Sequence, residues 1–187
     1  MTDSIILQPF NENWEERYKE IAAKLRAFLP DNAIIHHVGS TAINGLRAKD
    51  VIDIQVSVTD LTDIDCAAMA EHGFYFRPGV TDHCPEGISL NPEELDKLYF
   101  KHFGPDAHIH VRVRGRLNQR FPLVSRDYLR CHYATAKAYE RIKEVIVEQS
   151  STDKEFYYAI KDPVFDMIYA AAEQWAEADG WVEPPPD

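Results

Sequence analysis

A glycine–serine turn followed by a single acid is the pattern in this chain that most suggests chemistry. Gly39 and Ser40 end one apolar segment, and Asp53 lies inside the next. Backbone N–H groups and a hydroxyl in such a turn can approach phosphate oxygens, and a carboxylate on a neighbouring strand can hold the metal that phosphates require. The pattern therefore predicts a site for a phosphorylated small molecule.

Two segments of alternating polarity predict strands with one polar face each. Residues 51–58 alternate apolar side chains with Asp53, Gln55 and Ser57, and residues 107–114 alternate them with histidines and arginines (His108, His110, Arg112, Arg114). Because side chains alternate across a strand, two such strands in one sheet would gather these groups on a common polar floor. The alternative is a face that only meets water, as in many antiparallel sheets.

The His-x-His pair permits a metal interpretation. His108 and His110 could bind a metal with His102 or Asp53, because imidazoles and carboxylates are common ligands. A hydrolase triad of Ser40, His110 and Asp53 is disfavoured, because the chain has no GxSxG elbow. A P-loop is excluded as well, since no GxxxxGK[ST] motif occurs.

The charge distribution limits the partners. A formal net charge of −11 argues against general nucleic-acid binding by the whole surface. Six arginines nevertheless cluster against one acid, Asp127, so they either form a local anion site or pair with carboxylates elsewhere; they are Arg112, Arg114, Arg116, Arg120, Arg126 and Arg130.

Length and composition predict one domain over residues 1–187, with 45% hydrophobic residues, enough for a sizeable core. No apolar run approaches the length of a membrane span, and the N-terminus lacks the features of a secretory signal. Three cysteines without CxxC spacing are typical of a reduced, cytoplasmic protein. The Pro-rich end, residues 183–187, predicts a frayed tail.

The order of the predicted elements favours an α+β fold with a mixed sheet and a helical C-terminal third. Strands are expected at 5–9, 33–38, 51–58, 73–77, 97–103 and 107–114. Helices are expected from Asn11 or Asn13 to about Leu29, and at 61–71, 117–131, 134–149, 154–160 and 163–178.

The segment around the turn resembles the GrpB family, within the nucleotidyltransferase superfamily, whose shared pattern is a Gly-Ser turn followed by a strand with an acid-hydrophobic-acid pattern. The resemblance rests on matched residues that extend over nearly the whole chain: His37–Ala42, Gly45-Leu46, Ala48-Lys49, Ile52–Ile54, His108–Val111, Arg126–Arg130, Tyr158–Lys161, and Pro9-Phe10 with Trp14.

The resemblance implies a nucleotidyltransferase-like core, with helices on one face of a mixed sheet. It also implies that Asp53 ligates Mg²⁺. The predicted catalytic residues are Asp53 and, from the strand pattern of this chain, His110. A nucleotide or another phosphorylated small molecule is the expected ligand, and related domains fused to dephospho-CoA kinase hint at coenzyme metabolism. The predicted ligand contacts are Gly39, Ser40, Thr41, Lys49, Gln55, His108, Arg112, Arg126 and Lys161.

This chain departs from the superfamily pattern at its carboxylates. Gln55 stands at the second acidic position, and His108 and His110 stand where a third carboxylate would be expected. Two-metal transfer needs at least two carboxylates, so His110 could instead serve as a general base. Three functions stay open: a Mg²⁺-dependent nucleotidyl or phosphoryl transferase, a non-catalytic nucleotide- or anion-binding module, and an accessory protein whose cleft serves another polypeptide.

Overall fold

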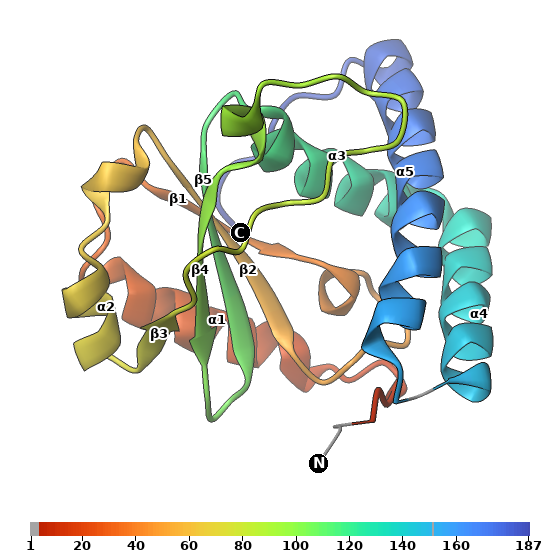
Figure 1. The fold of residues 1–187 in the computed structure, drawn as a ribbon, viewed down its shortest axis with the longest axis horizontal. Coiled ribbons are helices and arrows are strands. Elements are labelled where there is room, and N and C mark those ends of the chain that lie inside the picture. Colours follow the sequence, from red (N-terminus) through yellow and green to blue (C-terminus); the bar gives the residue numbers. More distant parts are fainter. Residues whose placement is uncertain (1–3, 151) are drawn as a thin grey trace.

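A five-stranded mixed sheet forms the centre of the structure (Figure 1). The computed structural model describes residues 4–150 and 152–187. The strands lie in the order β1-β2-β5-β4-β3, with β2 and β5 parallel and the other neighbours antiparallel. Their bounds are β1 Ile34–Val38, β2 Ile52–Val58, β3 Phe74–Phe76, β4 Lys97–His102 and β5 Ala107–Val113.

Helix α1 (Asn13–Arg26) packs on the apolar face of this sheet. Its buried residues recur at helical spacing and meet the apolar side chains of β2 and β5 in the main core. The short helix α2 (Cys66–Glu71) extends the same layer through Met69. Burying a large apolar side chain contributes about 2 kcal/mol, so this face supplies much of the stability and fixes which sheet face is left for polar groups.

The C-terminal third is helical, as predicted, and lies on the other side of the sheet. Helices α3 (Leu117–Cys131), α4 (Tyr133–Gln149) and α5 (Lys154–Asp179) pack against one another, at the right of Figure 1. Helix α3 reaches the polar sheet face, where the side-chain amide of Gln55 donates a hydrogen bond to the carbonyl of Gln119. The α+β class is therefore confirmed.

Three of the helices and strands predicted from the sequence are wrong. Residues 5–9 form no strand and make a single bridge, between Gln8 and Ala48. Residues 61–71 form a 3₁₀ turn (Leu61–Asp63) and then α2, because Asp65 accepts hydrogen bonds from two N–H groups and starts a new helix. The two helices expected at 154–160 and 163–178 are one, because packing on α3 and α4 continues the helix through Pro163.

The C-terminal tail is ordered against the sheet, contrary to the expected frayed end. The His36 ring lies 3.1 Å from the carbonyl oxygens of Pro184 and Pro185, and the Asp187 carboxylate accepts a hydrogen bond from the backbone N–H of His37 at 2.8 Å. The tail therefore covers the polar side of β1. Its contacts come from residues far apart in the chain, which composition alone does not reveal.

Within residues 4–150 and 152–187, no helix is long and apolar enough to cross a membrane. Cys66, Cys84 and Cys131 are free thiols.

Candidate functional site

The parallel pairing of β2 and β5 brings together the polar faces predicted from the two strands. Asp53 lies opposite His108, and Gln55 lies opposite His110. The side chains of Asp53 and His108 are each 33% exposed, and that of His110 is 17% exposed. Gln55 is fully buried. The expected polar floor is present, and the end of it nearest the Gly-Ser turn is open.

Gly39 holds the turn against the acid. Its backbone has φ 74° and ψ −172°, a conformation essentially restricted to glycine. A Cβ atom at this position would lie 2.5 Å from Oδ2 of Asp53, well inside van der Waals contact. Ser40 then starts a short 3₁₀ turn. Glycine is required here for two separate reasons, the backbone angle and the close approach to Asp53.

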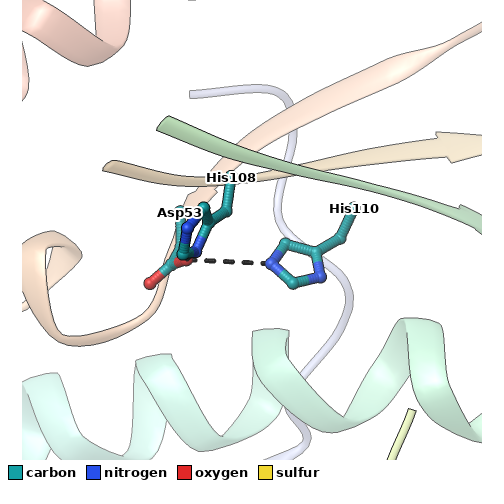
Figure 2. Close-up of side chains that lie close together, drawn as sticks. All are labelled: Asp53, His108 and His110. Carbon is teal, nitrogen blue, oxygen red and sulfur yellow. Dashed lines mark ion pairs between the residues drawn. The ribbon is translucent and has the colours of Figure 1, made fainter. Parts of the chain in front are cut away.

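Asp53, His108 and His110 form one cluster (Figure 2). Asp53 Oδ1 lies 3.3 Å from His108 Nδ1 and 3.7 Å from His110 Nε2. Burial alone would raise the pKa of Asp53, but its interactions with the two imidazoles outweigh burial and hold the pKa well below its usual range. Burial, reinforced by the Arg112 charge, lowers the pKa of His110 to about 4. At neutral pH the cluster therefore contains a carboxylate and at least one neutral imidazole.

A cavity of about 820 Å³ opens over this cluster. It lies between the polar floor of the sheet and side chains of α3, α4 and α5. Nearly all of the predicted site residues line it: Gly39, Ser40, Thr41, Lys49, Asp53, His108, His110, Arg112, Arg126 and Lys161. Gln55 is the exception. Its amide donates to Gln119 and accepts from Arg112 behind the cavity wall, so the structure gives its predicted ligand contact no support.

Lys143 is a cavity residue that the sequence interpretation missed. The residue is 2% exposed, and its Nζ donates hydrogen bonds of 2.9 Å to Ser40 Oγ and to the carbonyl of Arg47. Burial, reinforced by the neighbouring Lys161 charge, lowers the pKa of Lys143 to about 7. A signal was present, because Lys143 shares the buried stripe of α4 with Tyr139 and Ile146. A lysine at a core-facing helical position is unusual, so it marks a candidate site residue.

Two further lysines approach from the same side. Lys49 Nζ lies 4.3 Å from the ring centroid of Tyr157, and Lys161 Nζ lies 5.3 Å from that of Phe165. Burial, with the Lys161 charge, lowers the pKa of Lys49 to about 8. Like charges held together in a partly dry cavity repel one another, and an anion between them would relieve that repulsion.

The arginines have a different role from the lysines. Arg112 donates two hydrogen bonds to the Asp82 carboxylate, and Arg126 donates to the carboxylates of Asp127 and Asp187. Both line the cavity, but carboxylates already balance their charges. The arginine cluster was expected either to form a local anion site or to pair with carboxylates. Arg112 and Arg126 are paired with carboxylates.

Comparison with known proteins agrees with this architecture. A family described as GrpB protein matches residues 4–171. The crystal structure of conserved protein GrpB from Enterococcus faecalis superposes with a TM-score of 0.75 at 23% identity, and covers 91% of this chain and 99% of that one. At that identity the superposition supports the fold alone.

Curated relatives carry two kinds of name. The chain is 28% identical over 170 residues to UPF0157 protein SCO7215 of Streptomyces coelicolor, which covers 89% of this chain and 83% of the relative. It is also 28% identical over 193 residues to a protein named dephospho-CoA kinase from Mycolicibacterium paratuberculosis. That match covers 94% of this chain but only 47% of the relative, so the chain spans about half of that protein's length.

Proposed function

The chain belongs to the GrpB family, and from this premise we propose that it binds a nucleotide or similar phosphorylated small molecule and transfers its phosphoryl or nucleotidyl group with the help of a divalent cation. One observation carries the proposal: the Gly39-Ser40 turn, the Asp53 carboxylate and three lysines converge on one cavity. Metal-assisted phosphoryl transfer needs this combination of an anion cradle and a carboxylate for the cation.

Each group has a distinct role in this proposal. The backbone at Gly39, the hydroxyl of Ser40 and the ammonium of Lys143 face a terminal phosphate. Lys49 and Lys161 neutralise the rest of the phosphate chain. Tyr158, which lines the same region and is 44% exposed, offers a face against which a base can stack.

Asp53 is the anionic group available to a cation on the floor. Its lowered pKa keeps it ionised at neutral pH. The family resemblance points to Mg²⁺ as that cation, and Mg²⁺ prefers an octahedron of oxygen ligands, commonly one or two carboxylates completed by water and substrate phosphates. Here the neighbouring donors are two imidazoles and the second acidic position is Gln55, whose amide is engaged elsewhere. These donors do not match a two-Mg²⁺ site, so no reaction step is assigned to Mg²⁺.

That mismatch favours a second candidate function, a binding module that keeps the fold and the anion cavity without transferring a group. Gln55 is the specific observation in its support, because a neutral, fully buried side chain stands where the superfamily pattern has an acid. The two candidates share ligand binding and differ only in turnover.

Thermal stabilisation tests the shared part. The melting temperature is measured with ATP, GTP, CTP, UTP and dephospho-CoA, each with and without a divalent cation. We expect stabilisation that is lost in Asp53→Asn and kept in Asp31→Asn, a matched change at an exposed acid. An unchanged melting temperature with every ligand would reject the proposal. Release of phosphate or pyrophosphate with the stabilising ligand then distinguishes an enzyme from a binder.

A further inference from the structure

The donor cluster on the sheet floor fits a different metal from the one that the family resemblance implies. Asp53, His108 and His110 each offer one ligand atom, and these three atoms lie within 4.8 Å of one another. We propose that these three side chains form a site for a single transition-metal ion of the Zn²⁺ class. The inference deepens the proposed function, and it rests on that function for the role of the open cavity beside the ion.

The geometry supports a tetrahedral ion. Zn²⁺ lies about 2.0–2.2 Å from nitrogen and oxygen ligands, so neighbouring ligands of a tetrahedral site are about 3.4 Å apart. The two oxygen–nitrogen separations, 3.3 Å and 3.7 Å, bracket that value. The two imidazole nitrogens complete the set by small rotations of side chains that face the cavity and are partly exposed.

The chemistry of the donors points the same way. Imidazole suits Zn²⁺, Fe²⁺, Ni²⁺ and Cu²⁺, whereas Mg²⁺ takes carboxylate, carbonyl and water oxygens. Two histidines with one carboxylate is a set used by catalytic zinc sites, which keep one position open. The open side of this cluster faces the cavity that leads to Ser40 and Lys143, so a phosphate oxygen can occupy that position.

A neighbouring arginine modulates the site. Arg112 Nη2 lies 3.4 Å from His110 Nδ1. The same arginine makes shorter bonds to Asp82 and Gln55, between 2.7 and 2.9 Å, so the contact with His110 is the weakest that it makes. A metal on Nε2 places the proton on Nδ1, and the ring then has to turn away from this guanidinium. We therefore expect a reversible ion rather than the tightly held ion of a structural zinc site.

Direct metal titration tests the inference without any phosphate. Tag-free full-length protein is treated with a chelator, desalted, and titrated calorimetrically with Zn²⁺ and separately with Mg²⁺. Co²⁺ serves as a spectroscopic probe, because a tetrahedral cobalt site absorbs strongly in the visible region. We expect one Zn²⁺ ion per chain, bound more tightly than Mg²⁺.

Variants locate the ion. His108→Ala should weaken Zn²⁺ binding at least about 100-fold, since loss of a residue that only hydrogen-bonds to a metal ligand already costs roughly 10–100-fold. His110→Asn serves as the second variant if His108→Ala does not fold. The matched control is His72→Ala, which removes an exposed imidazole outside the cavity and should leave binding unchanged.

The outcomes separate this inference from the proposed function. Zn²⁺ binding no tighter than Mg²⁺ binding, or equal Zn²⁺ binding in His108→Ala and His72→Ala, overturns the metal site. A zinc site that is lost in His108→Ala stands even if no phosphorylated ligand stabilises the protein, in which case only the proposed function fails. Conversely, if nucleotide binding requires Mg²⁺ and is unchanged in both histidine variants, the proposed function stands and the metal site is overturned.

Discussion

Replacing Lys143 by methionine tests whether the protein keeps a buried cation beside Ser40 to bind anions. Methionine retains an unbranched apolar side chain of similar size, but it removes the charge and the donor to Ser40 Oγ and the Arg47 carbonyl. The consequences of losing the charge and of losing the donor both change with pH, and this pH dependence identifies the lysine as their source.

The magnitude follows from the environment of the ammonium. Burial lowers the pKa of Lys143 from 10.5 to about 7. At about 1.36 kcal/mol per pH unit, keeping this group charged in the folded protein costs on the order of 5 kcal/mol. The cost is complete below about pH 7. It disappears as the pH rises towards the ordinary lysine pKa, because the unfolded chain then holds a proton that the folded one lacks, so the free energy of unfolding rises with pH.

Urea unfolding at about pH 6.5 and about pH 9.5 measures this difference. The stability of Lys143→Met relative to wild type should fall by roughly 3 kcal/mol between the two pH values. At neutral pH the variant should also bind tripolyphosphate at least about 10-fold more weakly, which corresponds to one lost charged hydrogen bond of roughly 1.5–3 kcal/mol. Lys24→Met, at an exposed site on α1, is the matched control. A stability difference that is the same at both pH values, or tripolyphosphate binding equal to that of the control, would refute the reasoning.

Three other substitutions test the parts that support the site. Gly39→Ala should cost roughly 1–3 kcal/mol by backbone strain, and more from its clash with Asp53, with loss of ligand stabilisation; an unchanged melting temperature would contradict this. Asp82→Asn should cost about 3–5 kcal/mol near neutral pH by leaving the buried Arg112 unpaired. Because the pKa of Asp82 is lowered by charged partners that outweigh its burial, this difference should shrink in urea unfolding as the pH falls below about 4, and a constant difference would count against the ion pair. Asp187→Ala should cost about 1–3 kcal/mol in the same assay, because a buried arginine loses a partner, whereas a frayed tail would give no change.

The polar floor could be predicted from sequence because it depends on a short-range rule. Alternation along two strands fixes which side chains share a face, and it placed Asp53, His108 and His110 together before any pairing was known. The pattern could not show that β2 and β5 are parallel neighbours.

The parts that sequence reasoning missed depend on long-range contacts. Lys143 reaches Ser40 from a helix that lies far along the chain, and Asp82 neutralises Arg112 from the irregular segment between β3 and β4. The Asp187 carboxylate is held by Arg126, which turned a segment expected to fray into an ordered one. Composition and periodicity describe the local conformational preference of a segment. Each of these long-range contacts overrides that preference.

The most direct test of the central claim is a crystal structure determined with Mn²⁺ and a non-hydrolysable nucleoside triphosphate. The account predicts an anomalous peak on the Asp53 carboxylate, and phosphate density in contact with Ser40 Oγ and Lys143 Nζ. A triphosphate bound elsewhere on the protein, or a cavity that stays empty at saturating ligand, would contradict it.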